Sequence, residues 1–268
     1  MSKLIATCQS AVCILRRLLV GLFLLIGLAS VQSAEVISVC YESADVMPWR
    51  TADGKGLNFD LLQIVKERTG IEFKFTGIPW KRCLAGLQAR EYDAAIGASF
   101  SPERESFAVY PSSSRQLDRH KRMHTDRYVF LKIKGSSVTW EERKLRGFKG
   151  QVGIQLGYSV GADLLALGLE VDDGAQGGRQ LLSKLQAGRV DVIAMLEGEA
   201  RWLLDRDQMF GRLEILSEPI NEKDYFLIFS KAYFAQKGVL AEKVWAAIGR
   251  SRESIELSAT NKPASFWR

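Results

Sequence analysis

The sequence predicts an α/β protein with two lobes, each built on a parallel sheet, joined by a two-strand hinge. Strand-like and helix-like patterns alternate in each half of the chain, which is typical of βαβ units with parallel strands. The halves also share two short matches, of 70–73 with 168–171 and of 87–89 with 185–187, at one and the same spacing. We therefore favour a duplicated arrangement over the alternative, a single larger α/β domain with accidental similarity.

The two halves predict the same order of elements. Residues 61–65 place leucine, isoleucine and valine on one stripe, so we expect a helix capped by Asn58 or Asp60 and stopped by Gly70. The first half further predicts strands at 35–40, 71–75 and 92–98 and a helix at 80–89. The second half predicts strands at 152–156, 169–171 and 190–195 and helices at 160–167 and 179–187.

Two aromatic-rich extended runs, 128–133 and 225–229, lie where the chain would leave the first lobe and return to it. We expect them to be paired crossover strands that form the hinge. An amphipathic helix at 241–257, with Val244, Trp245, Ile248 and Ile255 on its apolar side, should pack back on the first lobe. The expected divisions are a signal at 1–34, a first lobe of 35–128 and 225–268, and a second lobe of 129–224.

Composition excludes several classes of protein. The 268 residues are 47% hydrophobic and 25% charged, and the mean hydropathy is −0.05, which excludes a disordered chain and a polytopic membrane protein. The formal charge is +6, but Lys3, Arg16 and Arg17 contribute three of these charges without an acid in the first 34 residues. The balance of the remainder is too mild to indicate a nucleic-acid partner.

The N-terminus has the order of a secretion signal. Arg16 and Arg17 precede an apolar run at 18–29 that is short for a membrane span, and small residues follow. We expect cleavage after Ser33 or Ala34 and a periplasmic mature protein; the alternative is an uncleaved anchor.

Export also changes how the cysteines are interpreted. Cys40 and Cys83 remain in the mature chain, an even pair in an oxidising compartment, so we expect a disulfide, with two buried free thiols as the alternative.

Residues that follow the predicted strands are the candidates for ligand binding, since ligands lie beyond the carboxyl ends of parallel strands. Arg104 can hold a carboxylate through its guanidinium, and Ser99 lies on the same loop. Ser159 begins a helix in the other lobe. The aromatic candidates for stacking on a ligand are Trp80, Trp49 and Tyr41. The alternatives are a surface salt bridge for Arg104, a plain helix cap for Ser159 and core packing for the aromatics.

Several of these segments together resemble the family 3 bacterial extracellular solute-binding proteins, the periplasmic receptors of polar amino-acid ABC importers. The segments are 56–60, Trp80, 87–93, 101–104, 150–159 and 188–191. The resemblance implies a two-lobed, periplasmic-binding-protein-like type II fold that closes on its ligand. It implies that Arg104 holds the ligand α-carboxylate, with Ser99 and Ser159 assisting and Trp80 stacking.

Three segments depart from the family pattern, and in one of them Val109 and Tyr110 stand before Pro111 where the family usually has Phe-Ser. Leu196 stands where amino-acid binders usually have an acid for the α-ammonium group, and Glu197, one step on, is a candidate to replace it. Tyr158 and Ser159 follow Gly157 in place of two threonines. A ligand carboxylate is therefore expected, whereas a ligand amine is not.

Three functions are compatible with these residues. The first is a monomeric receptor that binds a small molecule and docks on the permease of an ABC importer, without cofactor or metal. The second is an enzyme on the same fold, a dehydratase of a cyclic carboxylate, with Glu42, Glu197 and Glu199 as candidate acids or bases. The third is a ligand-sensing accessory module. His120 and His124 lack a third metal ligand nearby, so we expect no metal site there.

Overall fold

The computed structural model describes residues 35–114 and 116–261, with side chains to residue 253, and the predicted signal at 1–34 lies outside them. From Glu35 onward the chain forms one unit. In the described part of the chain, no helix is both long and apolar enough to cross a membrane.

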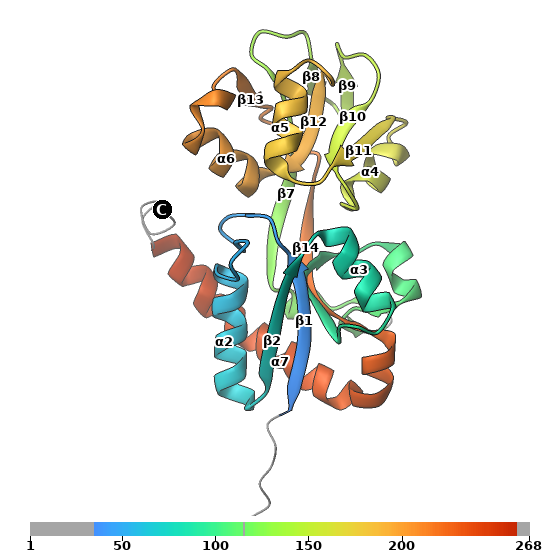
Figure 1. The fold of residues 1–268 in the computed structure, drawn as a ribbon, viewed down its shortest axis with the longest axis vertical. Helices are drawn as coiled ribbons and strands as arrows, with labels where there is room; N and C mark the ends of the chain where they lie inside the picture. Colours follow the sequence, from blue (N-terminus) through green and yellow to red (C-terminus); the bar gives the residue numbers. More distant parts are fainter. Residues whose placement is uncertain (1–34, 115, 262–268) are drawn as a thin grey trace, which may run out of the picture. The chain divides into compact units, whose positions relative to one another are not determined.

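The first lobe is built on three parallel strands with β1 in the centre (Figure 1). The strands are β1 (Val36–Glu42), β2 (Glu72–Ile78) and β3 (Ala94–Ser99), and the helices are α2 (Leu57–Thr69) and α3 (Trp80–Gln88). The residues of β3 belong to two different cores: Ala94 and Ile96 pack with α2, whereas Ala95 and Ala98 pack with α3. Both faces of this sheet are thus covered, as parallel sheets require.

Helix α2 ends where the sequence predicts but begins differently. Gly70 caps its C-terminus in the left-handed conformation, with φ 70°, as expected. The predicted caps Asn58 and Asp60 both lie inside the helix, which follows Gly56 (φ 107°). The side chain of Asn58 contacts His124 Nδ1 at 2.9 Å instead of capping the helix, because its position is buried.

The second lobe repeats the first, with parallel strands in the order β11–β10–β12. Its strands are β10 (Val152–Gln155), β11 (Val171–Ala175) and β12 (Val192–Leu196), and its helices are α4 (Val160–Ala166), α5 (Gly178–Gln186) and α6 (Glu197–Arg206). Asp93 and Asp191 are 98 residues apart, the same spacing as the two sequence matches, and each precedes a strand and accepts a backbone hydrogen bond. Asp93 accepts a hydrogen bond from Ser38 N and Asp191 from Lys149 N, each at 2.8 Å.

Two long antiparallel strands, β7 (His124–Ile133) and β14 (Asn221–Ser230), connect the sheets (Figure 1). They pair with each other over 124–128 and 221–225. The later part of β7 pairs with β12, and the later part of β14 pairs with β3. The strand pair of the predicted hinge is present, but the two expected segments, 128–133 and 225–229, each pair with a lobe rather than with each other.

The C-terminal helix α7 (Lys231–Asn261) packs on the first lobe, as expected. Its Val244, Trp245 and Ile248 are fully buried, and Trp245 Nε1 donates to Leu227 O at 2.7 Å. The side chain of Ile255 lies outside the described side chains. The remaining elements are η1 (Pro102–Ser106), β4 (Ala108–Val109), β5 (Ser112–Ser113), β6 (Gln116–Leu117), η2 (Arg119–Lys121), β8 (Thr139–Glu141), β9 (Lys144–Arg146), η3 (Gln208–Phe210) and β13 (Leu213–Ile215).

Candidate functional site

A small polar cavity lies where residues of both lobes meet. It is lined by Arg50, Trp80, Gly97, Ser99, Arg104, Tyr128, Tyr158, Ser159, Leu196 and Tyr225. Its volume is about 20 Å³, room for about one water molecule. The lobes therefore contact each other directly through these side chains, and a ligand larger than water has to separate them to enter.

Two predicted serines make the shortest of these contacts between the lobes. Ser99 ends β3, Ser159 precedes α4, and their hydroxyl oxygens are 2.7 Å apart. Lys223 on β14 donates to the Ser159 hydroxyl at 3.1 Å. Ser159 makes no side-chain cap on α4, so the plain helix-cap interpretation is wrong.

Arg104 is buried in the same cavity and crosses between the lobes. Its guanidinium donates to Ser99 O at 2.7 Å and to Gly157 O at 3.1 Å. Its central carbon lies 5.4 Å from the centre of the Trp80 ring, within range of a cation–π interaction. Only 5% of the residue is exposed, so the alternative of a surface salt bridge is wrong.

The position of Trp80 is set by the start of α3. Its backbone N–H donates to Glu42 Oε2 at 2.8 Å, so the carboxylate from the end of β1 satisfies one of the free amides of the helix N-terminus. Burial raises the pKa of Glu42. Glu42, a candidate acid or base for the enzyme alternative, thus has a helix-capping role.

A disulfide between Cys40 and Cys83 joins β1 to α3, with Cα atoms 5.6 Å apart. Both residues are fully buried. The bridge fixes α3, and with it the Trp80 ring, against the central strand of the first lobe.

Two predicted aromatic residues do not line the cavity. Tyr41 packs edge-on against Phe59 in the core of the first lobe, with ring centroids 4.9 Å apart. Trp49 stacks on His124 at 4.0 Å and donates from Nε1 to Asp126 at 3.0 Å. Burial raises the pKa of Asp126 to about 6 and lowers that of His124. For these two residues the alternative interpretation from the sequence, packing inside the protein, is the one that the structure shows.

Glu197, the predicted replacement for the acid that would hold a ligand ammonium group, does not line the cavity either. Glu197 begins α6 and forms ion pairs with Arg127 at 2.6 Å and Arg201 at 2.7 Å. Leu196, the position of the departure from the family pattern, lines the cavity and is 2% exposed. This wall of the cavity is thus apolar.

Sequence reasoning missed Arg50, which lines the cavity and is 4% exposed. Its Nη2 donates to the Tyr158 hydroxyl at 3.3 Å, which is a contact between the lobes. Gly97 leaves space for it, because a Cβ at Gly97 would lie 3.3 Å from Arg50 Nη1. Arg50 lies beside Trp49 in the loop after the first predicted strand, and this position in the sequence could have marked it as a candidate for ligand binding.

Among the acids of the second lobe, Glu199 has the pKa that is shifted most from its ordinary value. It is 1% exposed, and burial raises its pKa to about 8. Gln155 Nε2 donates to its Oε1 at 3.2 Å, whereas Oε2 is buried without a hydrogen-bond partner. The protonated form of Glu199 is therefore favoured at neutral pH.

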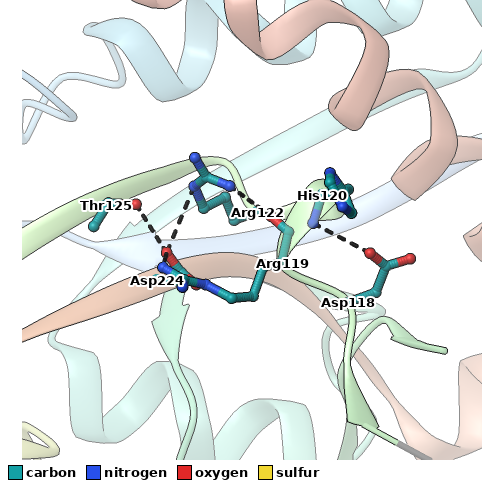
Figure 2. A network of polar contacts seen from close by, with 6 residues as sticks. All are labelled: Asp118, Arg119, His120, Arg122, Thr125 and Asp224. Atoms are coloured by element: carbon teal, nitrogen blue, oxygen red, sulfur yellow. Dashed lines mark hydrogen bonds and ion pairs between the residues drawn. The ribbon is translucent and has the colours of Figure 1, made fainter. Parts of the chain in front are cut away.

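A polar network surrounds Asp224 at the start of the crossover strands (Figure 2). Its carboxylate accepts hydrogen bonds from Arg119 and, at 2.8 Å, from Thr125 Oγ1. Arg122 Nε lies 3.5 Å from the same carboxylate. These contacts attach η2 to β14, and the His120 backbone N–H donates to the nearby Asp118. Arg119 and Arg122 thus have a structural role at this point.

Comparison with solved structures identifies the fold. Three solved structures share the fold. A histidine kinase sensor domain similar to periplasmic binding proteins is 16% identical, over 84% of this chain and 94% of that chain, with a TM-score of 0.67. A substrate-binding protein of an ABC uptake transporter from Streptococcus pneumoniae, with bound histidine, is 18% identical over 85% and 93%, with a TM-score of 0.65. A periplasmic binding protein of Salmonella typhimurium with high arginine specificity is 17% identical over 84% and 97%, with a TM-score of 0.64.

The fold is thus the two-lobed type II periplasmic-binding-protein fold. Residues 39–113 match the model of the bacterial extracellular solute-binding proteins, family 3. No curated protein matches the chain.

Proposed function

We propose that this protein is a periplasmic receptor that captures a small polar carboxylate or amino-acid-like ligand between its lobes for ABC-type import. The family match and the amino-acid-binding proteins that share the fold support a periplasmic binding protein. The proposal includes secretion through the signal at 1–34, lobes divided at 128/129 and 224/225, a monomeric state and a permease as partner.

The proposed class of ligand depends on the position and hydrogen bonds of Arg104. It is buried, it lines the cavity between the lobes, and its hydrogen bonds go to two backbone carbonyls instead of to a carboxylate. A ligand carboxylate is a better acceptor for a guanidinium than a neutral carbonyl, because the hydrogen bond is then charge-assisted on both sides. The carboxylate would replace these bonds together with the Ser99–Ser159 contact.

Binding of this kind favours a closed state. Ser159 and Gly157 belong to the second lobe, whereas Ser99 and Arg104 belong to the first. A ligand held by groups from both lobes interacts better with the closed form than with an open one, which shifts the population toward closure. A permease that recognises the closed form would then select loaded receptor.

The test is a thermal-shift screen against amino acids, dicarboxylates, polyamines and peptides. A ligand present at 100 times its Kd stabilises the folded state by about 2.7 kcal/mol. Arg104→Ala should abolish the shift caused by any carboxylate. Arg189 is exposed and does not line the cavity, so Arg189→Ala should keep the shift. An unchanged shift in Arg104→Ala would mean that this arginine is structural.

A sensor module is the second candidate, because a histidine kinase sensor domain shares the fold. Transport assays in cells separate the two: loss of the protein should stop uptake of its ligand if it serves an importer, and should leave uptake intact if it serves a sensor. The family match favours a binding protein over an enzyme. Turnover of a cyclic carboxylate, lost in Glu199→Gln, would favour the enzyme.

A further inference from the structure

Two buried arginines line one small cavity. Arg50 and Arg104 are 4% and 5% exposed; Arg50 lies in the loop after β1, and Arg104 lies in η1. Among the described side chains, neither forms an ion pair: Arg104 donates to two backbone carbonyls, and Arg50 donates to a tyrosine hydroxyl. A buried charge without a counter-ion is strongly unfavourable, so two of them in one cavity require an explanation.

The hydrogen bonds of Arg50 are far from complete. A guanidinium has five N–H donors, and the contact of Arg50 with Tyr158 is long, at 3.3 Å. Its Nε is buried and has no hydrogen-bond partner. The guanidinium therefore retains donors suited to the two oxygens of a carboxylate.

The acids nearest to Arg50 do not supply this partner. Glu42 and Glu199 both interact electrostatically with Arg50, but neither comes within ion-pair distance of it. The Glu42 carboxylate is engaged by the Trp80 amide. Burial raises the pKa of Glu199 to about 8, so at neutral pH it is mostly uncharged. The positive charge of Arg50 is thus only partly balanced by the protein.

We propose that the ligand carries two anionic groups, one held by Arg104 with Ser99 and Ser159, and the other held by Arg50 with Tyr158. This rests on the proposed function and narrows the ligand to a small dicarboxylate or an acidic amino acid. Each anion position combines an arginine of the first lobe with a hydroxyl of the second lobe. A dianion would accordingly hold the lobes together at two points, whereas a monocarboxylate would do so at one.

The test compares compounds that differ in one charge. Isothermal titration of the mature chain would measure L-glutamate against L-glutamine, L-aspartate against L-asparagine, and succinate against its monoamide. For at least one pair we expect the acid, which carries two carboxylates, to bind about 100-fold more tightly than its amide. The amide would leave the Arg50 guanidinium without a charged partner.

Variants assign this preference to Arg50. Arg50→Gln should reduce the ratio of the affinities for acid and amide in the preferred pair to below about 10-fold. Arg104→Gln should lower the affinity for both compounds of the pair. Tyr158→Phe, which removes one hydroxyl, should lower the affinity for the acid about 5-fold. This variant keeps the test valid if Arg50→Gln does not fold. Arg189→Gln serves as the matched control and should keep the ratio.

The outcomes separate this inference from the proposed function. Equal affinity for acid and amide, or a ratio unchanged in both Arg50→Gln and Tyr158→Phe, would overturn the second anion position and leave the receptor role intact. A wild-type chain that binds no carboxylate at all would overturn both.

Discussion

Ser99 and Ser159 belong to different lobes, yet their hydroxyl oxygens lie 2.7 Å apart. Both residues are buried, so the contact is shielded from water. It belongs to a set of contacts between the lobes that includes Arg104 with Gly157 and Arg50 with Tyr158. The same groups that would hold a ligand thus hold the lobes together, and ligand binding competes with these direct contacts.

The serine contact should be measurable as a coupling. A double-mutant cycle with Ser99→Ala and Ser159→Ala should give a coupling of about 0.5–1.5 kcal/mol in the free energy of unfolding without ligand. With saturating ligand the coupling should shrink, because each hydroxyl then bonds to the ligand instead. A coupling that ligand leaves untouched would contradict a shared use of these hydroxyls.

Gly97 should be required for the placement of Arg50. Its φ is 73°, and a Cβ there would approach Arg50 Nη1 to 3.3 Å. Gly97→Ala should cost about 1–2 kcal/mol of stability from the left-handed backbone alone. It should also weaken ligand binding by displacing the guanidinium. Denaturant unfolding and titration measure the two effects, and Gly188→Ala, with φ 68° but no atom within 4 Å of its Cβ, is the control for strain without displacement.

Removal of the disulfide should destabilise the first lobe. Cys40 and Cys83 are separated by 43 residues, so the bridge restricts a long loop in the unfolded chain. The double variant Cys40→Ala with Cys83→Ala should lose about 2–5 kcal/mol of stability. Reducing agent should lower the Tm of the wild type and leave the Tm of the double variant unchanged. An equal effect of reductant on both proteins would be inconsistent with this bridge.

Glu199 should make stability depend on pH. Its pKa is raised to about 8, above the value of an exposed glutamate, so the folded state binds its proton more tightly than the unfolded state. Stability should therefore fall as pH rises from about 4.5 to 8, and little further change from this group is expected above 8. Glu199→Gln should remove this loss and be more stable than the wild type at pH 8.5, with a smaller difference at pH 5. Urea unfolding at the two pH values tests this, and a wild type whose advantage grows with pH would contradict the assignment.

Much of the architecture follows from the sequence itself. The βαβ order of both lobes, the end of α2 at Gly70 and the packing face of α7 all depend on local periodicity and on glycine conformation, which neighbouring residues determine. The placement of Arg104, Ser99 and Ser159 was predictable for a related reason: the ends of parallel strands meet at one edge of the sheet.

The details of the cavity depended on tertiary structure. Tyr41 shares the inner face of β1 with Ile37 and Val39 and is therefore in the core, although it follows the same strand as the functional loop. Trp49 and Arg50 are neighbours in sequence, but one stacks on His124 and the other lines the cavity. The sequence by itself determined which segments reach the site. Which side chains of an irregular segment enter it was decided by packing between residues far apart in the chain, because no local period fixes their direction.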